Sequence, residues 1–115
     1  MNTIHLLPSC STCQRVLKTV EQVGQWKVRD IKSDPLTGEE VDAMAASAGS
    51  YENIFSRRAM LYRSRELNKQ DLSEEDYKTL ILEHYTFLKR PVMQVGDQYF
   101  AGSSKKTVEA AVRAV

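Results

Sequence analysis

The sequence of 115 residues contains only two cysteines and two histidines. It has no apolar stretch near the roughly 20 residues that a membrane-spanning helix needs. Its first residues, Met1-Asn2-Thr3-Ile4-His5, lack the basic start and apolar run of a secretory signal. We therefore expect a cytoplasmic protein with no membrane segment. In that reducing compartment, two cysteines are not expected to form a permanent structural disulfide.

The sequence also lacks an excess of charge of either sign. Its 16 basic and 15 acidic residues leave a formal net charge of +1, which gives no global field to gather nucleic acid or an anionic membrane. Any preference for anions must be local. A metal site is not expected either, because zinc would need two ligands besides the cysteines, and His5 and His84 have neither finger nor ribbon spacing.

The first third of the chain predicts a parallel crossover unit. The apolar run at residues 4–7 is typical of a buried strand. The valines of residues 11–23 recur at helical spacing, which predicts an amphipathic helix over this range that Gly24 ends. Residues 26–31 favour a second strand. Strand, helix and strand in this order pair the two strands in parallel.

The middle of the chain is predicted to be helical or irregular. Capping-box pairs open two helices there, Thr37 with Glu40 and Ser73 with Asp76. Between them, residues 48–69 are polar, rich in arginine and without a clear period. We expect an inserted helical or loop segment there rather than part of the core.

The last quarter of the chain predicts a hairpin and a helix. Residues 92–95 and 98–101 are strand-like and are joined by Gly96-Asp97, which suits a tight two-residue turn. A final helix from about Ser103 is expected to bury an apolar face that extends to Val115. The element order β-α-β, helices, β-β-α predicts an α/β fold with a mixed four-stranded sheet.

The motif Cys10-Ser11-Thr12-Cys13 directly follows the first predicted strand and opens the first predicted helix. Unpaired N–H groups and the helix dipole at that position stabilise a thiolate, which is the reactive form of cysteine. We assign Cys10 as the nucleophile and Cys13, one turn further on, as the resolving thiol. The resulting disulfide would be reopened by an external thiol system. The alternative is a pair of inert, buried cysteines.

Basic side chains are the candidates for binding an anion. Four arginines lie within residues 57–65, and Arg90 directly precedes Pro91. Guanidinium groups near a thiolate stabilise it and bind an oxyanion or a carboxylate by paired hydrogen bonds. The alternative is a solvated helix face. His84 shares an apolar helix face with Tyr77, so we expect it to be structural.

Three motifs together resemble the glutaredoxin-type arsenate reductase (ArsC)/Spx family, namely Pro8-Ser9-Cys10-Ser11-Thr12-Cys13, Gly49 with Arg57 eight residues later, and Lys89-Arg90-Pro91-Val92. The resemblance covers nearly the whole chain. It implies that residues 1–115 form a single thioredoxin-like domain with a helical insertion at about residues 36–88. It also implies a cis peptide bond at Pro91, and it places Arg57 and Arg90 at the anion or thiolate site.

The resemblance implies two alternative functions. One is an arsenate-reductase-like oxidoreductase without a bound cofactor, which acts on a small oxyanion or a disulfide and is reduced by glutathione and glutaredoxin or by thioredoxin. The other is an Spx-like redox-sensing regulator that binds RNA polymerase rather than DNA. The chain departs from arsenate reductases of this type by its second cysteine, Cys13, by Ala101-Gly102-Ser103 where a third arginine falls, and by Leu6 in place of a histidine. These departures leave the substrate open.

Overall fold

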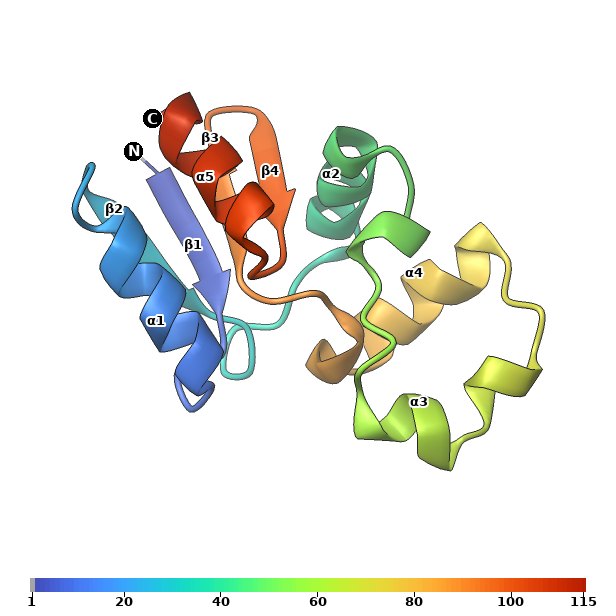
Figure 1. Ribbon diagram of the computed structural model, residues 1–115. Coiled ribbons are helices and arrows are strands. Elements are labelled where there is room, and N and C mark those ends of the chain that lie inside the picture. The colour runs from blue at the N-terminus through green and yellow to red at the C-terminus, as the bar shows by residue number, and fades with distance from the viewer. Residues whose placement is uncertain (1) are drawn as a thin grey trace.

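A computed structural model describes residues 2–115 and contains a four-stranded sheet with helices on both faces (Figure 1). In chain order the elements are β1 Asn2–Leu6, α1 Ser11–Val20, β2 Trp26–Asp30, α2 Gly38–Ala48, the 3-10 helix η1 Glu52–Ile54, α3 Met60–Ser64, η2 Leu67–Lys69, α4 Glu74–Glu83, η3 Tyr85–Phe87, β3 Val92–Val95, β4 Gln98–Ala101 and α5 Lys105–Ala114. The predicted α/β fold is confirmed. In the described part of the chain, no helix is long and apolar enough to cross a membrane.

The strands lie in the order β2-β1-β3-β4. β1 runs parallel to β2 and antiparallel to β3, and β3 pairs antiparallel with β4. The helix α1 forms the crossover between the parallel strands, and Gly96-Asp97 forms the turn of the β3-β4 hairpin. The sheet is therefore mixed, as the element order predicts.

One face of the sheet packs against α1 and α5. Alternate residues of a strand point to opposite faces, and Ile4, Leu6 and Met93 are completely buried on this face. The helices contribute a buried stripe at helical spacing to the same cluster: Cys13, Val16, Val20, Val108 and Ala111. Because Cys13 belongs to this cluster, the motif is fixed to the core on its inner side.

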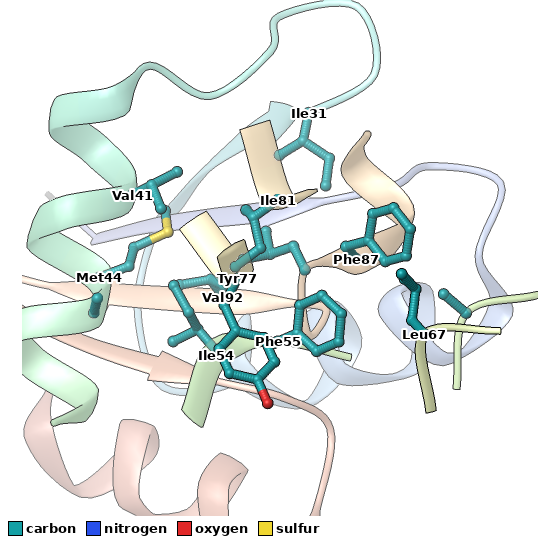
Figure 2. Packing of buried hydrophobic residues seen from close by; sticks show 13 residues of the cluster. Ile31, Val41, Met44, Ile54, Phe55, Leu67, Tyr77, Ile81, Phe87 and Val92 are labelled. Atoms are coloured by element: carbon teal, nitrogen blue, oxygen red, sulfur yellow. The ribbon is translucent and has the colours of Figure 1, made fainter. Parts of the chain in front are cut away.

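The opposite face carries a second cluster, to which the segment between α2 and β3 contributes (Figure 2). The expectation that residues 48–69 lie outside the core is wrong. Ile54 and Phe55 are completely buried and Leu67 is 6% exposed. The Phe55 ring stacks on Phe87 with 5.5 Å between the ring centroids. Ile54 and Leu67 lie in 3-10 helices of three residues, and Phe55 directly follows the first of these helices. Such helices are too short to show a period in the sequence.

Two helices end earlier than their apolar residues suggest. α1 ends at Val20, and Val23 is 43% exposed. The Val20 carbonyl accepts from the Val23 N–H at 3.1 Å, in a turn rather than an α-helical bond, and from the indole N–H of Trp26 at 2.9 Å. At the C-terminus, α5 ends at Ala114 and leaves Val115 49% exposed. The prediction that Val23 and Val115 are buried is therefore wrong.

Both predicted capping boxes are present. The Thr37 hydroxyl accepts from the Glu40 N–H, and the Glu40 carboxylate accepts from the Thr37 N–H. Ser73 and Asp76 make the same reciprocal pair at the start of α4. Glu40 also forms an ion pair with Arg29 of β2, which ties the start of α2 to the edge of the sheet.

The outer edge of β4 is covered by α2. Ser47 of α2 accepts a hydrogen bond from the Tyr99 N–H at 2.9 Å, and its hydroxyl donates to the Tyr99 carbonyl at 3.3 Å. One side chain thus satisfies both backbone groups of a residue at the sheet edge.

Gly49 ends α2 in the left-handed region, with φ of 100°. A side chain in this conformation costs about 1–2 kcal/mol, so we expect Gly49→Ala to lower the free energy of unfolding by about 1 kcal/mol. Gly38→Ala is the matched control, because its new Cβ would lie 4.0 Å from Leu82 Cδ1, an ordinary contact. Urea titrations of both variants measure the difference. An equal effect of the two changes would contradict this account of Gly49.

Candidate functional site

The loop from β1 to α1 positions Cys10 at the N-cap of α1. The Cys10 N–H donates to the Leu7 carbonyl at 3.0 Å, and the Cys10 carbonyl accepts from the Gln14 N–H at 3.1 Å. The Gln14 side chain also reaches back to the Pro8 carbonyl at 3.1 Å. The cysteine is thus held between a turn and the first helical hydrogen bond, with its side chain partly exposed.

The Cys10 side chain accepts no regular capping hydrogen bond, yet its surroundings lower its pKa below the ordinary value of 9.0. Burial of the sulfur opposes the shift. It is outweighed by weak hydrogen bonds from the backbone N–H and the thiol of Cys13, by the Thr12 N–H and by the positive charge of Arg90. Amide groups at a helix start therefore act on Cys10 as the sequence predicts.

Cys13 is completely buried, and both cysteines are free thiols. Burial raises the pKa of Cys13 to about 11, and the hydrogen bond and charge of Cys10 add to the rise. The Leu7 backbone and Arg90 act in the opposite direction but do not overcome these effects. At neutral pH the pair therefore holds one thiol prepared to ionise and one that stays protonated.

Arg90 lies beside this pair, directly before Pro91. The Arg90–Pro91 peptide bond is cis, which is the conformation that the family resemblance implies. Arg90 Nη1 donates to the Tyr85 carbonyl at 3.1 Å. Its Nε is buried and has no hydrogen-bond partner among residues 2–115. One N–H donor of this guanidinium is thus buried without a partner.

Arg57 is not among the groups that act most strongly on the pKa of Cys10. Its guanidinium pairs with the Glu52 carboxylate. Arg57 Nη2 also donates to the Tyr77 hydroxyl at 3.1 Å. Arg57 and Arg90 both line the same pocket.

This basic pocket has a volume of about 390 Å³. Its lining contains four cationic side chains, four hydroxyl side chains and three other residues: Arg57, Arg58, Lys89 and Arg90, then Ser56, Ser103, Ser104 and Thr107, then Phe55, Ala101 and Gly102. Cys10 is not part of the lining. Arg90 therefore links the pocket to the thiols, because its charge lowers the pKa of both.

Other charged candidates lie outside this arrangement. Arg65 pairs with Glu83 at 2.6 Å, outside the pocket, and Arg63 does not line it either. His84 accepts from the Thr86 N–H and so has a structural role, but it follows α4 with φ of −152° and does not lie on the apolar helix face that the sequence predicts. Among residues 2–115, no group of three or more His, Cys, Asp or Glu side chains is placed to hold a metal ion.

Sequence reasoning missed the residues that complete the pocket. Lys89 stands in the Arg-Pro motif but was not singled out, and Ser104 and Thr107 gave no signal beyond a helix start. Glu52 lies five residues before Arg57, a spacing that a regular helix would not bring together. The short 3-10 helix and the loop after it bring them together instead.

The difference between the two thiols predicts their alkylation. We expect iodoacetamide to modify Cys10 with a pH midpoint below 9.0 and to leave Cys13 unmodified until the pH approaches about 11. Removing the nearby charge in Arg90→Gln should move the Cys10 midpoint upward. Arg113→Gln makes the same charge change in the last turn of α5 and should have no effect. Mass spectrometry over a pH series measures both sites, and a wild-type midpoint at 9.0 or above contradicts the prediction.

Known proteins resemble this chain along most of its length. Global transcriptional regulator Spx of Enterococcus faecalis is 28% identical over 95 residues, which are 81% of this chain and 72% of that protein. The Spx of Bacillus subtilis is 26% identical over 95 residues, with the same shares covered. The arsenate reductase from Vibrio cholerae superposes with a TM-score of 0.81 at 19% identity, over 99% of this chain and 97% of the other. This structural likeness shows a shared fold.

A sequence profile identifies the family directly. Residues 5–111 match the profile of the ArsC family. The matched range contains both cysteines, the pocket-lining arginines and the cis proline. The chain therefore belongs to the ArsC family.

Proposed function

We propose that this protein is an arsenate-reductase-like thiol-disulfide oxidoreductase that uses a Cys10/Cys13 dithiol cycle. One observation carries the proposal: the surroundings lower the pKa of Cys10 and raise that of Cys13 to about 11. A lowered pKa is typical of a reactive cysteine at a helix start, whereas burial alone raises the pKa of an inert thiol. The difference provides an attacking thiolate and a protonated partner one helical turn away.

In the first step, the Cys10 thiolate attacks one sulfur of a substrate disulfide. The substrate S–S bond breaks, a mixed disulfide to Cys10 forms, and the second substrate sulfur leaves as a thiolate. Arg90 stabilises negative charge at this place, as its effect on the pKa of both cysteines indicates.

In the second step, Cys13 loses its proton and attacks the Cys10 sulfur. This releases the remaining substrate half as a thiolate and forms the Cys10-Cys13 disulfide. The negative charge and hydrogen bond of Cys10 raise the pKa of Cys13, and both contributions end once Cys10 is in a disulfide. Burial, the largest cause, remains, so the first step lowers the pKa of Cys13 only by the part that Cys10 contributed.

The substrate has then gained two electrons from the dithiol. A thioredoxin, or glutathione with glutaredoxin, returns them by the same exchange, so the cycle needs no bound cofactor. Such reductants are cytoplasmic, which is where we propose that the protein acts. Electrons pass from the reductant to the Cys10-Cys13 disulfide and from the dithiol to the substrate.

The basic pocket favours a substrate that carries an anionic group. Arg57 and Arg90 offer guanidinium donors, which bind carboxylates and oxyanions by paired hydrogen bonds. The segment Ala101-Gly102-Ser103 stands where arsenate reductases of this type carry a third arginine, so the pocket offers the Ser103 hydroxyl on that side. We therefore propose an anionic disulfide, rather than arsenate, as the preferred class of substrate.

A second candidate function is redox-controlled binding to RNA polymerase. The curated relatives bear the name global transcriptional regulator Spx, and Gly49 and the two-cysteine motif are the features that this chain shares with Spx. In this function, oxidation of the Cys10/Cys13 pair is the switch rather than a step of turnover. The protein would contact the polymerase and not DNA.

One comparison separates the two functions. The purified protein is given NADPH with a glutathione and glutaredoxin system or a thioredoxin system, and NADPH consumption is followed with arsenate, oxidised glutathione and bis(2-hydroxyethyl) disulfide. Turnover above that of the reductant system alone, and lost in Cys10→Ser, supports the reductase. No turnover, together with stronger capture of RNA polymerase subunits by oxidised than by reduced protein, supports the regulator. If neither occurs, both proposals are wrong.

A further inference from the structure

The guanidinium of Arg57 is already occupied although the side chain lines the basic pocket. Its Nη2 lies 2.5 Å from Glu52 Oε2 and 3.1 Å from the Tyr77 hydroxyl. Its Cζ lies 5.8 Å from the centroid of the Tyr77 ring. Glu52 does not line the pocket itself. An acidic side chain from outside the pocket therefore uses a donor that a bound anion would need.

The other cations of the pocket have no such partner. Among the described residues, Arg58, Lys89 and Arg90 form no ion pair. Arg90 donates to the Tyr85 carbonyl, which is neutral. The pocket thus contains three cations without an acidic partner and one, Arg57, whose charge is neutralised by Glu52.

The geometry points to Glu52 as a specificity-determining residue that competes with the substrate for Arg57. A substrate with an anionic group displaces Glu52 and gains Arg57, whereas a neutral substrate leaves the Arg57-Glu52 pair intact. The two side chains are 47% and 50% exposed, and ion pairs this exposed are weak. The exchange therefore costs little. This inference rests on the proposed function, because it concerns the substrate of the same site.

Kinetics with two model disulfides test the competition. In Glu52→Gln, we expect the KM for anionic oxidised glutathione to fall about two- to fivefold with kcat unchanged. The KM for neutral bis(2-hydroxyethyl) disulfide should stay the same. Glu83→Gln is the matched control, because Glu83 pairs with Arg65 at 2.6 Å with similar exposure, 47% and 39%, and Arg65 is outside the pocket. Equal changes for both disulfides, or the same change in Glu83→Gln, would overturn the inference.

A binding experiment separates this inference from the proposed function. Inorganic sulfate is titrated into the reduced protein, and the amide resonances of the pocket residues are followed by NMR. We expect Glu52→Gln to bind sulfate about two- to fivefold more tightly than wild type, and this gain to disappear in the Arg57→Gln background. Absence of sulfate binding in every variant overturns the inference but not the thiol chemistry. Tighter binding without turnover of any disulfide supports the inference and contradicts the reductase.

Discussion

Replacing Cys10 by serine is expected to abolish disulfide turnover, with a loss on the order of 10³-fold or more, because a hydroxyl at this position does not ionise at neutral pH. Cys13→Ser is expected to fail differently. Its Cys10 still attacks, so the protein should accumulate a mixed disulfide with the substrate and release it slowly. Intact-mass spectrometry after one addition of oxidised glutathione should show the adduct on Cys13→Ser and none on Cys10→Ser.

The two serine variants control for one another. Both replace sulfur by oxygen at the start of α1, and circular dichroism spectra like that of wild type would show that the fold is kept. Equal adduct formation by both variants would contradict the assignment of Cys10 as the nucleophile. An adduct on Cys10→Ser alone would reverse the two roles and leave the buried Cys13 as the attacking thiol.

Truncation of Phe55 is expected to be the most destabilising single change that we consider. Its side chain is completely buried between Tyr77 and Phe87, with ring centroids 4.8 Å and 5.5 Å away. Phe55→Ala removes these contacts and leaves a cavity, which costs about 3–5 kcal/mol in the cores of other proteins. Urea unfolding followed by circular dichroism measures the loss.

Met60→Ala is the control for this change. Met60 also belongs to the segment between α2 and α4, but its side chain is 85% exposed, so its removal should alter the free energy of unfolding by no more than about 0.5 kcal/mol. A similar small effect for Phe55→Ala would mean that this segment does not contribute to the stability of the core. That result would return the segment to the peripheral role that its polar sequence predicts.

Local signals in the sequence predict much of the fold. The capping boxes of Thr37 and Ser73 and the Gly96-Asp97 turn depend on neighbours within three residues, so the residue types suffice to recognise them. The position of Cys10 before a helix follows in the same way. Its lowered pKa needs only amide groups of the same turn and one nearby arginine.

Local signals do not predict contacts between residues that are distant in the sequence. Phe55 is buried because Phe87, 32 positions later, provides a surface for its ring. Val23 is exposed because the chain turns after Val20, where the Val20 carbonyl accepts from both the Val23 N–H and the Trp26 indole N–H. The type of Arg57 and its place in a motif predict that it belongs to the site. Its ion-pair partner, Glu52, is determined by how the backbone folds between α2 and α4.

The hydroxyl of Ser47 at the rim of β4 has a consequence for assembly. A free strand at the side of a sheet is a template for another chain, and proteins that expose one risk forming dimers or fibrils through it. Here an arriving peptide would find the N–H and carbonyl of Tyr99 already engaged and would have to push α2 aside. Growth of the sheet from this side is therefore blocked in the folded protein.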